Sequence, residues 1–273
     1  MSDFDRDIAG VRYGRVSRSE TAVIDAGLRA YMLRIYNYMM LGLAITGIAA
    51  LGIYMLSVTG DAASAAHVLR GGTEIPARIA GDMYLTPIGY AVYASPLKWV
   101  IMLAPLALVF GLSFGSARLR PATAHALFWL YAALVGLSLG AIFMVFTHTS
   151  IVRVFFITAA SFAALSLWGY TTQRDLSGWG SFLIMGLFGI IIAGLVNLFL
   201  QSSALQWAVS VIGMFVFAGL TAWDTQRLKT EYLHAVMDGE TAERSAILGA
   251  LSLYLNFLNL FNLLLQSLGQ REE

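Results

Sequence analysis

SFLIMGLFGIIIAGLVNLFL, residues 181–200, is an uninterrupted apolar run that contains no charged residue. A helix of roughly 20 apolar residues crosses a hydrocarbon core of about 30 Å. Within lipid, only a helix or a closed barrel satisfies its backbone hydrogen bonds internally. The run therefore predicts a transmembrane helix, and it decides the class of the protein.

Similar apolar stretches recur on both sides of this run, separated by short polar joints. Their flanks predict seven spans, at residues 35–58, 96–117, 122–146, 150–170, 179–201, 205–223 and 246–268. We therefore expect an all-α, polytopic membrane protein. Six crossings are the alternative, if the last and most polar segment is re-entrant.

The polar segments divide the chain further. We expect a cytoplasmic N-terminal arm at residues 1–34, a transmembrane domain at 35–269 and a short tail at 270–273. The long first connection, residues 59–95, is expected outside the membrane. The charged run at residues 230–245 is typical of a solvated loop, with a short amphipathic helix as an option.

The composition excludes several classes of protein. Hydrophobic residues make up 58% of the chain and charged residues 12%, whereas soluble domains carry roughly 25% charged residues. The net charge of +1 argues against a nucleic-acid binder, and the absence of cysteine excludes disulfides. No sequence motif of a metalloprotease, a serine hydrolase or a phosphate-binding loop is present, so we expect no enzyme.

Basic residues set the expected orientation. Twelve of the 17 Lys and Arg residues fall on one side of a seven-span layout. Cytoplasmic loops are enriched in these residues. We therefore expect the N-terminus in the cytoplasm and the C-terminus on the opposite side.

The last predicted span carries a polar face. Ser252, Asn256, Asn259 and Gln266 fall within one stripe at about 100° per residue. Unpaired amides are costly in hydrocarbon, so this stripe should point into the bundle or a water-filled cavity. Two interpretations stay open: the stripe lines a pathway, or it joins helices by hydrogen bonds worth about 0.6–2 kcal/mol each.

Asp224 ends the sixth predicted span within WDTQR, residues 223–227. The negative end of a helix penalises a carboxylate, so something should compensate it. One interpretation is a pair with Arg227 at the lipid surface. The other is a partly buried acid at the cytoplasmic mouth of a polar cavity, paired with a basic residue of another helix.

The seven-span layout, WDTQR and the run LYLNFLNLF at residues 253–261 together resemble the Bax inhibitor-1, or transmembrane Bax-inhibitor-motif, family in its bacterial branch. The resemblance covers about residues 30–269. It implies six helices around a central, polar last helix, a bacterial inner-membrane location, and a pH-sensitive calcium leak. It implies no tightly bound cofactor, with Ca²⁺ as the transported or regulatory ion.

The resemblance also implies roles for single residues. In the family, two aspartates share a proton as a pH sensor and an arginine acts as a latch. By position, the first acid is Asp224 and the latch is Arg118, with Arg120 as a substitute, whereas Asn256 replaces the second acid. An Asp–Asn pair has one titratable group. We therefore expect weaker Ca²⁺ binding at Asp224 and Asn256, and a simpler response at lower pH, than in two-acid relatives.

A second function is implied by bacterial members of the family, which bind a membrane-anchored AAA protease and modulate it. The arm at residues 1–34 would suit this role, because such a protease grips an unstructured end. The expected partners are the lipid bilayer and, in this second role, the AAA protease, and the expected functional unit is a monomer. Small residues spaced by four, among them Gly136 and Gly140, indicate internal helix packing, with a homodimer face as the weaker alternative.

Overall fold

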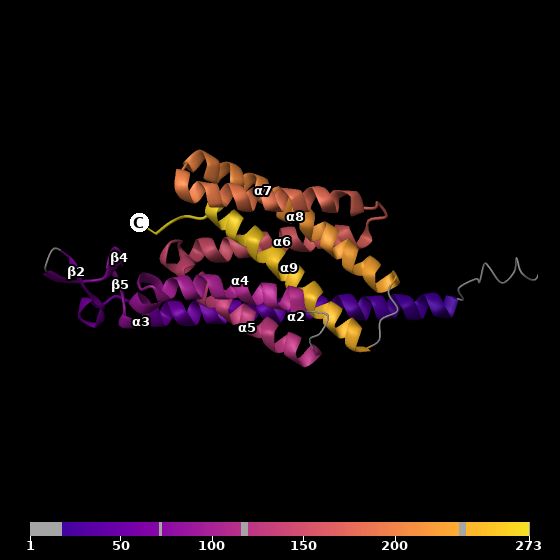
Figure 1. The fold of residues 1–273 in the computed structure, drawn as a ribbon, viewed down its shortest axis with the longest axis horizontal. Helices are drawn as coiled ribbons and strands as arrows, with labels where there is room; N and C mark the ends of the chain where they lie inside the picture. Colours follow the sequence, from indigo (N-terminus) through magenta and orange to yellow (C-terminus); the bar gives the residue numbers. More distant parts are fainter. Residues whose placement is uncertain (1–17, 71–72, 116–119, 235–238, 273) are drawn as a thin grey trace, which may run out of the picture.

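The fold is that of an all-α, polytopic membrane protein (Figure 1). The computed structural model describes residues 18–70, 73–115, 120–234 and 239–272. Within these ranges, six helices are long and apolar enough to cross a membrane: α2 (Arg18–Ser57), α5 (Pro121–Leu139, continued by η3, Gly140–Met144), α6 (His148–Thr171), α7 (Ser177–Leu200), α8 (Ser203–His234) and α9 (Gly239–Leu268). The apolar runs thus located these helices correctly.

The second predicted span is the irregular one. Its helix, α4 (Leu97–Gly115), follows α3 (Pro87–Gly89) and η2 (Tyr90–Ala94), and the two parts meet at a bend of 59°. Only together do they pass as a membrane span. From the sequence, the last segment was the one expected to be re-entrant if only six helices cross. In the structure, the last helix, α9, is unbroken. The bent element α3–η2–α4 therefore decides between six and seven crossings.

Three helices extend further than expected. α2 begins at Arg18 and not near residue 35, so the second half of the predicted arm is helical. α8 continues to His234 and α9 begins at Gly239, which makes the interpretation of residues 230–245 as a loop wrong for most of that segment. The physical reason is that charged residues mark the end of the hydrocarbon core, whereas the helix continues into water.

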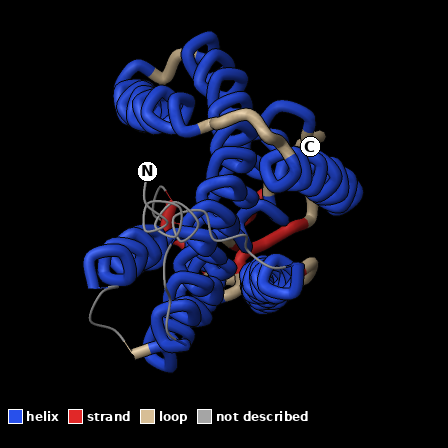
Figure 2. Tube along the Cα trace, turned by 90° about the vertical axis from the view of Figure 1, so that its right-hand side faces the viewer, coloured by secondary structure: helices blue, strands red, loops and turns tan. Residues whose placement is uncertain are grey.

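The first long connection carries strands that the sequence did not predict. β1 (Val58–Thr59), β5 (Met83–Leu85) and β4 (Arg78–Ala80) form an antiparallel sheet in that order, and β2 (His67–Arg70) pairs with β3 (Thr73–Pro76) as a hairpin. In Figure 1 these strands lie at the left end of the molecule, with the C-terminus. Figure 2 looks from the opposite end, and the strands lie behind the helices.

α9 is the most buried of the six helices, and it packs against α2, α5, α6 and α8. Tyr254 of α9 is fully buried, and its hydroxyl lies 2.6 Å from Oγ1 of Thr46 on α2. α7 packs mainly on α8 and is the least buried of the six. A Cβ added to Gly136 would lie 2.5 Å from the Thr46 carbonyl oxygen, and one added to Gly140 would lie 2.4 Å from Ile53. These two small residues therefore serve packing between helices of the same chain, as expected.

Candidate functional site

The contact between α8 and α9 is built around the carboxylate of Asp224, which is only 4% exposed. Its Oδ2 accepts hydrogen bonds from Ser252 Oγ and Asn256 Nδ2, both at 2.7 Å. Its Oδ1 lies 2.8 Å from Arg227 Nη2. Ser252 and Asn256 are four residues apart, so they share one face of α9. One charged group thus holds two helices together.

The structure combines the two interpretations of Asp224. The acid pairs with Arg227 on its own helix, as the surface interpretation expected, yet it is buried against α9, as the cavity interpretation expected. Arg227 reaches outward with 45% of its side chain exposed, and its guanidinium lies 5.0 Å from the ring centre of Trp223. A buried carboxylate is therefore neutralised by a cation that remains in contact with water.

The structure describes only one of the two predicted latch arginines. Arg118 lies outside the described residues. Arg120 is exposed at the start of α5 and, in the part of the chain that the structure describes, forms no ion pair. Arg227 occupies the position next to the carboxylate, so a latch role for Arg118 or Arg120 stays a prediction.

Only two of the four residues in the polar stripe of α9 contact Asp224. Ser252 and Asn256 meet Asp224, Asn259 is half-buried about one turn further along, and Gln266 is exposed near the end of the helix. The helical spacing correctly placed Ser252 and Asn256 towards a neighbouring helix. A pore-lining role for Ser252, Asn259 and Gln266 stays a prediction.

Asp224 and Asn256 offer Ca²⁺ a poor resident site. Ca²⁺ takes six to eight oxygen ligands, usually with several carboxylates. Among the described residues, no three His, Asp or Glu side chains cluster in a way that could hold a metal ion. Both oxygens of Asp224 are already engaged by donors. A passing cation would have to compete with these donors, and weak Ca²⁺ binding at Asp224 and Asn256 stays a prediction.

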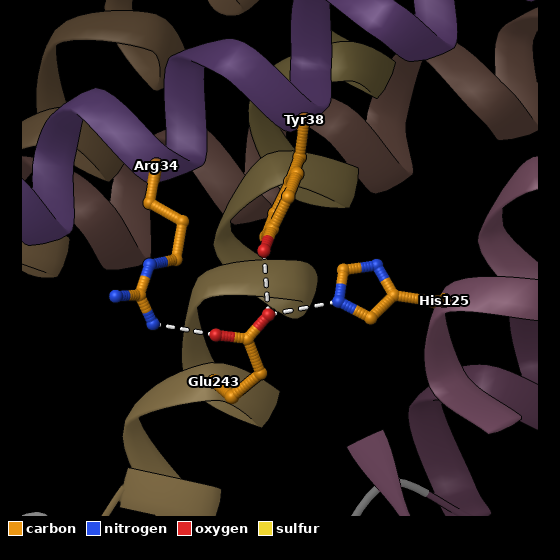
Figure 3. Close-up of polar contacts among 4 residues, drawn as sticks. All are labelled: Arg34, Tyr38, His125 and Glu243. Atoms are coloured by element: carbon orange, nitrogen blue, oxygen red, sulfur yellow. Dashed lines mark hydrogen bonds and ion pairs between the residues drawn. The ribbon is translucent and has the colours of Figure 1, made fainter. Parts of the chain in front are cut away.

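A second polar site, which the sequence did not reveal, joins α2, α5 and α9 (Figure 3). Oε1 of Glu243 accepts a hydrogen bond from Tyr38 at 2.5 Å and lies 2.8 Å from His125 Nε2. Its Oε2 lies 2.5 Å from Arg34 Nη1. We call these four residues the Glu243 cluster. One carboxylate on α9 thereby connects three helices.

The sequence missed the Glu243 cluster because Glu243 falls within residues 230–245, the charged run that was expected to form a loop. A signal was nevertheless present, because the seven-span layout puts Arg34, His125 and Glu243 at the same side of the membrane, each near a helix end. What the sequence did not reveal is that these three ends meet.

A chain of hydroxyl groups leads from α2 to the residue beside Asp224. The Tyr36 hydroxyl lies 2.6 Å from Ser166 Oγ on α6, and Ser166 Oγ lies 2.9 Å from Thr225 Oγ1 on α8. Thr225 is fully buried. These hydroxyl groups therefore join α8 to α6 and α2 at the residue next to Asp224, whereas the Asp224 carboxylate itself bonds to α9.

Comparisons with known proteins cover both sites. A family model described as "Inhibitor of apoptosis-promoting Bax1" matches residues 28–273. The inner membrane protein YbhL of Escherichia coli K12 is 41% identical over 260 residues, which are 94% of this chain and 99% of YbhL. An uncharacterized protein of Rickettsia prowazekii is 43% identical over 255 residues, 93% of this chain and 95% of that one. A protein of Caulobacter vibrioides is 41% identical over 273 residues, the full length of both chains.

Proposed function

This chain belongs to the Bax inhibitor-1 family of membrane proteins, and from that premise we propose that it is a pH-sensitive calcium leak, gated where Asp224 joins α8 to α9. The observation that carries the proposal is a single buried carboxylate on α8 that accepts two hydrogen bonds from α9 and pairs with Arg227 of its own helix. The choice of Ca²⁺ as the ion rests on the family resemblance, whereas the position proposed for the gate rests on these contacts.

The gate works through the charge of Asp224. While the carboxylate is ionised, it accepts charge-assisted hydrogen bonds from α9, which are roughly twice as strong as neutral ones. Protonation removes the attraction to Arg227 and leaves only neutral hydrogen bonds to Ser252 and Asn256. The contact between α8 and α9 is then weaker, so the leak should increase as the pH falls.

The path follows α9. In this proposal seven helices cross the membrane, counting the bent α4 element, and six of them surround α9. An ion would enter at Asp224 and follow the polar face past Asn259 towards Gln266 at the other end of the helix. Because Ca²⁺ binds weakly along this face, it can leave as readily as it enters, which suits a leak.

The orientation and the membrane complete the proposal. The excess of Lys and Arg puts the start of α2 and the link between α8 and α9 on the cytoplasmic side. The relative YbhL is an inner membrane protein, and we assign this chain to the same membrane. Since Gly136 and Gly140 are used for packing within the chain, a monomer is the simplest functional unit.

Purified protein in liposomes loaded with a Ca²⁺ indicator tests the proposal directly. With an imposed Ca²⁺ gradient, we expect flux above that of protein-free liposomes, and we expect it to increase on acidification. Flux equal to that of protein-free liposomes at every pH would refute the leak.

A regulatory role towards a membrane-anchored AAA protease is the second candidate. One observation favours it: α2 projects beyond α8 and α9 at the end where the chain begins (Figure 1). Its first turns therefore present the N-terminal side of the chain away from the bundle. In this role, the arm would engage the protease while the helices anchor it in the membrane.

A further inference from the structure

A groove of about 610 Å³ lies between α2 and α6. Apolar side chains form most of its wall, among them Met39, Leu43, Phe155 and Phe162. Its size falls within the range of roughly 300–1,000 Å³ that is typical of ligand pockets. In a membrane, an apolar groove of this kind is filled by lipid.

The length of the groove fits one leaflet. Along α2 its wall extends from Arg29 to Leu43, and along α6 from Phe155 to Tyr170. At 1.5 Å per residue, each wall is about 21–23 Å long. Half of a bilayer, headgroup region included, is about 20–22 Å thick, so the groove is long enough to reach from the level of the headgroups to the middle of the bilayer.

The end of the groove near the headgroups is basic. Arg29 lines it and is exposed, and within the described residues it has no ion-pair partner. Lys229 Nζ lies against Tyr170 of the same end, 2.8 Å from its carbonyl oxygen and 5.4 Å from its ring centre. Arg29 at the mouth of the apolar groove, with Lys229 of α8 beside Tyr170 of its wall, complements a phosphate that carries an acyl chain.

The polar atoms inside the groove are already satisfied. The hydroxyls of Tyr36 and Ser166 line the wall, but they bond to each other, and Ser166 bonds to Thr225. These hydroxyls therefore need no hydrogen-bond partner from a ligand, and the wall is effectively apolar along its length.

From these observations we infer that the groove binds one anionic phospholipid, with an acyl chain between α2 and α6 and the phosphate at Arg29 and Lys229. The bound chain would contact the hydroxyl groups that lead to Thr225, next to Asp224. Anionic lipid would then brace α2 and α6 against α8 close to the proposed gate.

The test is native mass spectrometry of the purified, full-length protein titrated with dioleoyl phosphatidylglycerol or dioleoyl phosphatidylcholine. We expect one phosphatidylglycerol to be retained more strongly than phosphatidylcholine. Arg29→Gln should lower the affinity for phosphatidylglycerol about tenfold, because a charge-assisted contact is lost. The matched control is Arg153→Gln, which removes an exposed charge at the other end of α6 and should leave the preference unchanged.

A second pair of variants tests the groove itself. Ala163 is exposed and lines the groove, whereas the neighbouring Ala164 is exposed outside it. Ala163→Trp should therefore abolish retention of the lipid, and Ala164→Trp should not. Equal retention of the two lipids by the native protein would overturn the inference. So would native affinity in Arg29→Gln, or equal effects of the two tryptophans. The binding readout does not depend on ion flux, so its outcome is separate from that of the leak.

Discussion

Asn256→Asp is the substitution that most sharply probes the Asp224 site, because it supplies the second acid that the family resemblance implies. In the native protein, Asn256 Nδ2 donates to Asp224 Oδ2 at 2.7 Å. The substitution replaces this donor by a carboxylate oxygen. Two unit charges about 4 Å apart repel by about 4 kcal/mol at an effective dielectric constant of 20. At 1.36 kcal/mol per tenfold change, this repulsion corresponds to about a thousandfold tighter hold on one shared proton.

The pair should therefore keep one proton near neutral pH and titrate as a coupled unit. We expect the Ca²⁺ flux of Asn256→Asp to respond to pH more steeply, and closer to neutrality, than that of the native chain. The assay is flux from liposomes across neutral and mildly acidic pH. The control is Asn197→Asp, which adds the same charge to α7, away from both the Asp224 contact and the proposed path. Identical profiles for native and Asn256→Asp protein, or an equal shift in the control, would refute the reasoning.

Three further changes have defined outcomes. Glu243→Gln breaks the carboxylate contacts that join three helices, so it should lower the free energy of unfolding by about 1–3 kcal/mol. The effect would be seen as a lower melting temperature in detergent. The control, Glu240→Gln at an exposed position, should melt like the native protein. Gly169→Ala should destabilise by about 1–3 kcal/mol, because its Cβ would lie 2.2 Å from a carbonyl oxygen of α8, whereas Gly47→Ala meets nothing within 4 Å and should be tolerated. Deleting residues 2–17 spares α2 and should leave Ca²⁺ flux intact. If the arm has the regulatory role, the deletion should also abolish co-purification with the AAA protease. Intact co-purification would show that the arm does not have this role.

The membrane spans could be predicted because the hydrocarbon core fixes the length of an apolar run. The length of an apolar run does not reveal where a helix ends in water. For this reason the starts of α2 at Arg18 and of α9 at Gly239 differ from expectation. The length of an apolar run also does not predict the short strands β1 to β5. They are two to four residues long and carry no apolar alternation that separates them from a loop.

The two polar sites show the same division. Helical periodicity placed Ser252 and Asn256 on one face of α9. Asp224 lies inside α8 and not, as the sequence had suggested, at its end, but it does have the compensating partner that was expected. Both expectations depend on a single helix, and both hold in the structure. The Glu243 cluster depends on which helices are neighbours, since Arg34 and Glu243 are 209 residues apart in the chain. A single sequence does not contain that information in a form that periodicity can reveal.

The pH response of Asp224→Asn is the most direct test of the gate. The variant keeps the size of the side chain and removes the charge, so it mimics the protonated state at every pH. The control is Asp175→Asn between α6 and α7: hydrogen bonds from Ser177 hold the pKa of the exposed Asp175 carboxyl below its usual value, so it stays ionised in mild acid. We predict that Ca²⁺ flux through Asp224→Asn is high and independent of pH, while Asp175→Asn behaves like the native protein. A native pH profile in Asp224→Asn would contradict the account.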